Sequence, residues 1–364
     1  MHYFGITTMQ IHNLVDLGWS HYFQSQLDLK SLESQLPFRV VAVQRNLIEC
    51  VGLDSENQQK NLQLSTYYWR DEPPEGRPAI GDWLLVDLDF QPLRILERKS
   101  LIKRRSAGRE SSVQLIASNI DTVFIVTSCN DEFSINRIER YLSIAAESNI
   151  HCVVVLTKID LCSDTRPYFE AISHDHPNLQ VEMVNATDAP SLCALKKWIE
   201  PGQTVALLGS SGVGKSTIIN SLKGNQDQTT AAVRESDSKG RHTTTSRSLH
   251  CLPGGGLLLD NPGMRELQMI DTEEGIKTAF SDIDSLAKNC RFKNCRHTTE
   301  PGCAVIEEIK AGRLEQRRLD NYHKLLSEQT RNNESLAERR YNDRALGRFY
   351  KNALKSSRRF KSRE

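Results

Sequence analysis

The sequence predicts an α/β protein of three parts: a phosphate-binding, mostly parallel sheet with flanking helices lies between a small β-barrel and a helical, metal-binding C-terminal region. Three observations predict this fold class. A Gly-rich loop joins an apolar run to a helical segment near residue 210, short β-branched runs fill residues 38–100, and a Cys/His cluster occupies residues 290–303. The chain has 364 residues, which is enough for two or three domains.

Composition indicates a water-soluble globular protein, with 38% hydrophobic and 26% charged residues and a net charge of +1. No apolar run is long enough to span a membrane, and the first residues lack the basic and apolar regions of a signal peptide. We therefore expect a cytoplasmic monomer with no membrane partner. Its nine cysteines are expected to be thiols or metal ligands rather than disulfides.

The first 100 residues contain two segments of different pattern. Residues 1–37 are polar and suggest a helical extension, whose apolar side chains (Leu14, Leu17, Trp19 and Phe23) would dock on the next domain. Residues 38–102 hold short apolar runs separated by Pro- and Gly-bearing loops, which indicates an OB-like barrel. Such a barrel binds nucleic acid or serves as a protein-docking module. The basic, small-residue stretch 103–113 is expected to be a flexible linker.

A βαβ unit is expected next, because apolar runs at 121–127 and 151–156 flank a segment of helical spacing at 135–148. The second run ends in Thr157, Lys158, Ile159 and Asp160, at the sheet edge where such folds bind ligands. This pattern is typical of guanine recognition, in which the Asp160 carboxylate accepts from N1–H and the 2-amino group. A further strand at 180–184 ends in Asn185 and Ala186, which we also assign to the nucleotide.

The Gly-rich loop has the G-x-x-x-x-G-K-S pattern of a phosphate-binding P-loop, in the required strand–loop–helix context. Its backbone N–H groups and the following helix N-terminus would hold the phosphates. Lys215 would contact the β- and γ-phosphates, and Ser216 would ligate Mg²⁺. The expected nucleotide-binding residues are Gly209, Ser210, Ser211, Gly212, Val213, Gly214, Lys215, Ser216 and Thr217.

Two later segments are expected to complete the triphosphate site. The polar loop at 239–245 contains His242 and Thr244, and Thr244 would close over Mg²⁺ and the γ-phosphate. An apolar run then leads into D-x-P-G, in which Asp260 would hold the Mg²⁺ water shell and the Gly263 amide would contact the γ-phosphate.

The order of these motifs is specific, because the guanine elements precede the P-loop. The chain resembles the circularly permuted bacterial ribosome-biogenesis GTPases of the small ribosomal subunit-dependent GTPase A family. The resemblance implies a circularly permuted GTPase domain over 114–284. It further implies GTP hydrolysis with Mg²⁺ and binding to the small subunit and its rRNA during late maturation. Thr157 stands where the family usually has Asn, so we expect somewhat weaker GTP binding without a change of base.

A second sharp signal lies in the region 285–364, which we expect to be a zinc-binding domain with a basic helical tail. Three thiols and an imidazole lie within 14 positions, and three thiolates with one neutral imidazole make a closed tetrahedral Zn²⁺ site. The expected ligands are Cys290, Cys295, His297 and Cys303, and the family resemblance places its zinc site here too. A closed site indicates a structural metal. The alternative is a set of unrelated cysteines.

The remaining residues have helical and basic patterns. Residues 304–326 are expected to be helical and to pack on the zinc loop. Residues 331–364 carry eleven Lys/Arg against four Asp/Glu with aromatics between them. This pattern favours an RNA-contacting surface over a merely solvated tail.

The residue after Gly263 is Met264, which cannot orient a water molecule. Intrinsic turnover should therefore be slow, and His242 is the candidate that supplies the missing group. Two other functions remain open: a GTP-dependent metal-delivery protein, which predicts an exchangeable metal, and an RNA-binding module whose GTPase has decayed. The presence of Lys215, Ser216 and Asp260 disfavours the second.

Overall fold

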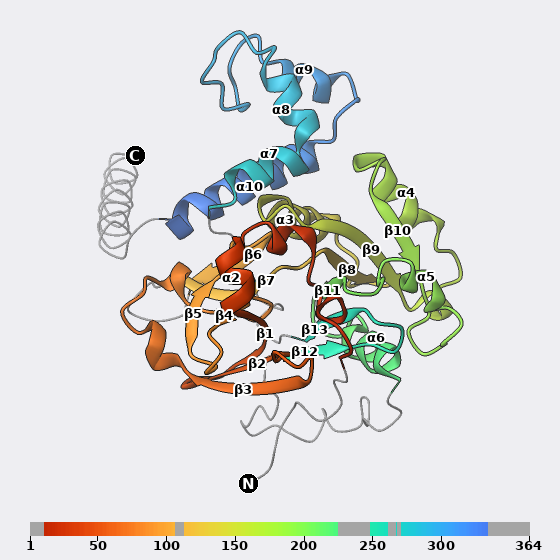
Figure 1. The fold of residues 1–364 in the computed structure, drawn as a ribbon. Helices are drawn as coiled ribbons and strands as arrows, with labels where there is room; N and C mark the ends of the chain where they lie inside the picture. Colours follow the sequence, from red (N-terminus) through yellow and green to blue (C-terminus); the bar gives the residue numbers. More distant parts are fainter. Residues whose placement is uncertain (1–10, 106–112, 225–247, 261–266, 268–270, 334–364) are drawn as a thin grey trace, which may run out of the picture.

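The computed structural model describes residues 11–105, 113–224, 248–260, 267 and 271–333 (Figure 1). Within these ranges the chain forms an α/β centre, a β-rich N-terminal part and a helical C-terminal part, as the sequence predicts. None of the described helices is both long and apolar enough to cross a membrane.

The centre is a sheet whose strands run in the order β10-β9-β8-β11-β13-β12. The first five of these strands are parallel and β12 is antiparallel to β13, which confirms the mostly parallel sheet. The strands are β8 (Thr122–Ser128), β9 (His151–Thr157), β10 (Gln180–Met183), β11 (Thr204–Leu208), β12 (Ser248–Cys251) and β13 (Leu257–Asp260). Because parallel strands place their carboxyl ends at one edge, the motifs that follow β9, β11 and β13 meet there.

Helices cover both faces of this sheet because its strands are apolar on both sides. Along β8, Val123 and Ile125 belong to one buried cluster, and Phe124 and Val126 belong to the other. The helices on the first face include α3 (Ile135–Glu147) and α7 (Glu273–Ala279). Those on the second include α5 (Cys193–Lys196) and α6 (Lys215–Lys223). The short helix η4 (Ile159–Leu161) and α4 (Arg166–Asp175) follow β9.

The N-terminal part contains five antiparallel strands in the order β3-β2-β1-β4-β5, the OB-like unit. Its strands are β1 (Leu36–Val43), β2 (Leu47–Leu53), β3 (Gln59–Ser65), β4 (Trp83–Val86) and β5 (Pro92–Ile95), with η2 (Thr66–Trp69) and η3 (Pro74–Gly76) between β3 and β4. A pairing between Ala42 and Ser248 joins β1 to β12. The barrel and the central sheet therefore form one hydrogen-bonded path of strands, which the sequence did not indicate.

The N-terminal extension packs against the barrel, as expected from its apolar residues. It contains η1 (Leu14–Leu17), α1 (His21–Gln24) and α2 (Leu29–Ser34). The rings of Trp19 and Phe23 lie 4.8 and 5.9 Å from the ring of Trp83, and the buried Arg39 donates to the carbonyl of Leu17 at 2.8 Å. Burial lowers the pKa of Arg39 to about 10. These contacts fix the extension on the barrel.

The structure differs from the predicted linker at 103–113. Residues Leu101–Arg105 form β6 and Val113–Ser118 form β7, and the two strands pair as a separate antiparallel sheet. The ends of the predicted linker are thus ordinary strand, and residues 106–112 lie outside the described residues. Pairing with β7 gives the backbone of this basic stretch its hydrogen-bond partners.

The C-terminal part contains α8 (Ser281–Ala287), α9 (Ala304–Lys310) and α10 (Gln316–Asn333). The expectation that residues 304–326 are helical is confirmed for α9 and for the first part of α10, but not for the residues between them. The helical stretch is interrupted at 311–315, where Gly312 has a φ of 72°. Beyond this break α10 lies along α7 and α3 (Figure 1). The basic tail from residue 334 lies outside the described residues.

Candidate functional site

The P-loop follows β11 at the carboxyl edge of the sheet and leads into α6. Three of its glycine positions have positive φ: Gly209 at 151°, Gly212 at 81° and Gly214 at 98°. A Cβ atom at Gly209 would lie 2.3 Å from the carbonyl oxygen of Val126, so this position has no room for a side chain. The glycines let the loop curl so that its backbone N–H groups can converge on phosphates.

Lys215 is the first residue of α6 and is 9% exposed. Its Nζ donates to the carbonyl of Gly209 at 2.7 Å and also to the carbonyl of Ser210. The two carbonyls hold the ammonium group next to the P-loop, where a β- or γ-phosphate would bind. Ser216 and Thr217 follow in the same first helical turn.

Thr157 is fully buried, and its Oγ1 lies 2.6 Å from the carbonyl oxygen of Val213 in the P-loop. The carbonyl of Thr127 is 3.1 Å away, and the single hydroxyl proton can serve only one acceptor at a time. Thr157 therefore joins the guanine motif to the P-loop. The sequence pattern does not indicate this role, because residues 157 and 213 are far apart in the chain.

Changing Thr157 to Val should weaken GTP binding about five- to tenfold. The isosteric side chain keeps the volume but removes the donor to Val213, and a lost hydrogen bond costs about 1 kcal/mol. Titration with a fluorescent GTP analogue measures the effect, and a thermal melt separates it from unfolding. Unchanged affinity in a folded variant would contradict a role for this bond.

The guanine motif continues through a tight turn after β9. Lys158 has a φ of 58° and is the N-cap residue of η4, which contains Ile159 and Asp160. Asp160 is exposed, as a side chain that binds a ligand must be before binding. On the neighbouring strand, Asn185 follows β10, and the carbonyl of Ala186 accepts from Ser221 of α6 at 3.2 Å. The structure thus brings the two predicted guanine elements to adjacent strand ends.

Asp260 ends β13 at the same edge. Its Oδ2 lies 3.6 Å from Nζ of Lys223, a residue outside the motifs that the sequence predicts. Burial lowers the pKa of Lys223, and Asp260 opposes this shift. His250 on β12 is close to both groups, and burial followed by the charge of Lys223 lowers its pKa to about 4. Gly263, His242, Thr244 and Met264 lie outside the described residues.

The predicted metal ligands lie together. The ligand atoms of Cys290, Cys295, His297 and Cys303 all lie within 4.8 Å of one another. His297 Nδ1 is 3.6 Å from the Sγ of Cys290 and 3.3 Å from that of Cys303, and these two sulfurs are 3.9 Å apart. Tetrahedral Zn²⁺ with Zn–S bonds of about 2.3 Å requires sulfur separations of roughly 3.8 Å. The four side chains therefore fit a zinc ion.

Glu300 stabilises the loop that carries His297. Its carboxylate accepts from the backbone N–H groups of Arg296, Thr298 and Thr299 at 3.0, 2.9 and 3.1 Å. These bonds, that of Thr298 first, lower the pKa of Glu300 to about 2. The carboxylate thus stays ionised and holds the loop at the metal site at any pH where the thiols can bind a metal.

Sequence comparisons agree with this geometry. The sequence model of the RsgA GTPase family matches residues 95–270. A Vibrio parahaemolyticus protein described as small ribosomal subunit biogenesis GTPase RsgA 2 is 45% identical over 345 residues, covering 95% of this chain and 94% of its own. A Mesorhizobium japonicum protein described as small ribosomal subunit biogenesis GTPase RsgA is 44% identical, covering 88% and 91%.

Two solved structures share the fold. YjeQ from Thermotoga maritima superposes with a TM-score of 0.60 at 22% identity, covering 80% of this chain and 99% of its own. YloQ, described as a circularly permuted GTPase, has a TM-score of 0.58 at 23% identity, covering 83% and 97%. The likeness confirms the circularly permuted arrangement in which the guanine elements precede the P-loop.

Proposed function

The chain belongs to the RsgA GTPase family and is a GTP hydrolase; from this we propose that it binds the small ribosomal subunit and hydrolyses GTP during late maturation of that subunit. The proposal rests on one observation: Lys215, Asp160 and Asp260 lie at the same edge of the central sheet. The names of its relatives support a role in ribosome biogenesis, and such a role fits a cytoplasmic protein. Contacts with rRNA would come from the OB-like barrel and the zinc-binding region.

The chemistry is the positioning of phosphoryl transfer to water. Asp160 would accept from guanine, with Lys158, Ile159, Asn185 and Ala186 around the base. The P-loop N–H groups and Lys215 would bind the phosphates and take up charge that develops on the γ-phosphoryl group. Ser216 and Thr244 would ligate Mg²⁺, which neutralises phosphate charge when bound, and Asp260 would hold its water shell. The Gly263 amide would contact the γ-phosphate.

The zinc site supports a structural role more than metal delivery. Its four donors surround one point and leave no protein ligand position open, and Cys303 and His297 are 2% and 7% exposed. A cargo site would have to release its ion. Zinc that stays at one ion per chain through extended dialysis supports the structural role, whereas zinc that exchanges with GTP turnover supports delivery.

GTPase activity with and without purified small subunits tests the proposed function. We expect slow intrinsic turnover and a faster rate with small subunits, because Met264 supplies no water-orienting group. Large subunits at equal concentration are the control. Equal rates with both subunits would contradict the proposed partner while leaving the GTPase assignment intact.

His242 is our candidate for the water-orienting group. Changing His242 to Ala should leave GTP binding and basal turnover nearly intact but remove most of the stimulated rate, because an ordered group next to the attacking water lowers the barrier by several kcal/mol. Stimulated kcat is measured together with subunit binding. Full stimulation in the variant rules out His242, and loss of both stimulation and binding assigns it to docking.

A further inference from the structure

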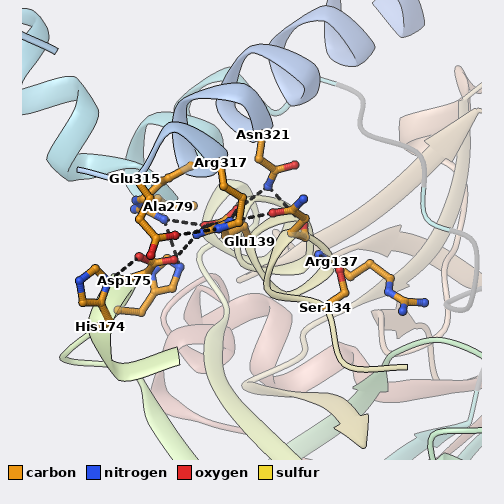
Figure 2. A network of polar contacts seen from close by, with 12 residues as sticks. Ser134, Arg137, Glu139, His174, Asp175, Ala279, Glu315, Arg317 and Asn321 are labelled. Carbon is orange, nitrogen blue, oxygen red and sulfur yellow. Dashed lines mark hydrogen bonds and ion pairs between the residues drawn. The ribbon is translucent and has the colours of Figure 1, made fainter. Parts of the chain in front are cut away.

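Helix α3 has polar contacts on two opposite sides, and each side reaches a different part of the molecule. Arg137 and Glu139 are two residues apart on this helix and therefore point in nearly opposite directions. Figure 2 shows Arg137 pointing away from the cluster of side chains around Glu139. One side of the helix thus faces the P-loop and the other faces α10.

On the first side, Arg137 contacts the P-loop directly. Its Nη1 donates to Oγ of Ser210 at 2.7 Å, and its Nη2 donates to the carbonyl of Glu132 at 2.7 Å. Ser210 is also the residue whose backbone carbonyl accepts from Nζ of Lys215. Arg137 therefore holds the P-loop residue that in turn orients the phosphate-binding lysine.

On the second side, Glu139 anchors α10. Its carboxylate is fully buried and accepts from Arg318 at 2.8 Å, from Arg317 at 3.2 Å and from Asn321. Arg317 also donates to the Asn136 side chain at 2.7 Å. A buried carboxylate requires such partners, and loss of one is costly. The position of this turn of α3 is therefore set by α10.

Further contacts tie α10 to its surroundings. Arg318 forms two bonds of 2.7 Å with Asp282 of the segment that precedes the zinc site, and Arg317 pairs with Asp175 at the end of α4. At the far end, Arg140 of α3 pairs with Glu328 at 2.8 Å. Helix α10 thus has polar attachments at Arg317 and Arg318, near its start, and at Glu328, near its end.

We propose that Arg137 is a positioning residue for Lys215, acting through Ser210, and that α10 sets the position of Arg137 through Glu139. Polar contacts join α10 to α3 at Glu139 and α3 to the P-loop at Arg137, and the backbone of α3 connects these two residues. A displacement of α10 would therefore change how well Lys215 stabilises the transition state. This inference rests on the proposed function, because it assigns a regulatory input to the same nucleotide site.

Intrinsic GTP turnover of Arg137→Met provides the first test. We expect kcat to fall about tenfold, because small misplacements of a catalytic group are costly, with less than a threefold change in GDP affinity. Arg137→Lys should recover part of the rate, since an ammonium can still donate to Ser210. A kcat within twofold of wild type in Arg137→Met would overturn the proposal.

Arg317→Met tests the α10 side, and combining it with Arg137→Met closes a double-mutant cycle. We expect the single variant to lower kcat about threefold and the double variant to be no slower than Arg137→Met alone, because one path is already interrupted. Two independent effects that multiply would overturn the coupling. If Arg317→Met melts at a lower temperature than the wild type, Glu139→Gln replaces it in the cycle, because this change keeps the shape of the side chain and removes its charge.

Arg313→Met is the matched control, because Arg313 pairs with Glu308 on an exposed surface outside this path. It should keep wild-type kcat. Failure of the proposed function is distinguishable, because it appears in the wild-type protein as absent GTP turnover or absent stimulation by small subunits. Failure of this inference leaves wild-type turnover normal and changes only the variants.

Discussion

Removal of zinc, or the change Cys295→Ser, is expected to unfold the loop and helix around residues 290–310 while the nucleotide site remains folded. Structural zinc in small domains contributes about 10–16 kcal/mol of apparent binding free energy, which here would be folding free energy of this segment. Within the loop, Phe292 is 41% exposed and the four donors lie outside helices and strands. We expect α10 to keep its place, since Glu139 and Asp282 bind it independently of the metal.

Limited proteolysis with mass spectrometry, a zinc assay and GTP-analogue titration check this outcome. New cleavage sites should appear between α8 and α10, with nucleotide affinity within about threefold of the native protein. Cys193→Ser is the matched control, because Cys193 is an exposed thiol outside the cluster. Undiminished protection after complete chelation would show that the segment folds without metal.

The change Asp160→Asn is expected to weaken GTP binding by at least tenfold, about 1.4 kcal/mol or more. The carboxylate can accept from both N1–H and the 2-amino group of guanine. The amide of asparagine has only one acceptor oxygen, and its NH2 group would face a donor group of guanine. The same variant should bind xanthosine triphosphate better than the wild type does, because xanthine has an acceptor oxygen where guanine has the amino group. The result would assign base recognition to this side chain.

Competition titrations with GTP, ATP and xanthosine triphosphate measure this change. Asp164→Asn is the control, since Asp164 is a nearby carboxylate that pairs with exposed Arg166 at 2.9 Å. GTP affinity that survives Asp160→Asn, or equal affinity of the wild type for ATP, would remove Asp160 from the guanine site.

Local pattern predicted the parts of this protein whose residues are close in the chain. The P-loop glycines and the Cys/His spacing each specify a backbone path over a few residues, so their type and position follow from the sequence. Apolar runs located the strands for the same reason, as at β8 and β9. Errors arose where local pattern was ambiguous. The basic stretch at Lys103 is a strand paired with β7, and Gly312 divides a helical pattern into two helices with different neighbours.

Only the tertiary structure decided how these parts meet. The bond from Thr157 to the P-loop joins residues 56 apart, that from Arg137 to Ser210 joins residues 73 apart, and that from Arg318 to Glu139 joins residues 179 apart. None has a sequence signature, because a threonine or an arginine on a helix is equally compatible with solvent. Parallel strands brought the separated motifs to one edge, and burial of the α3 face selected which charges had to find partners. The sequence determined which chemical groups are present, and the packing of the sheet and helices determined which of them act together.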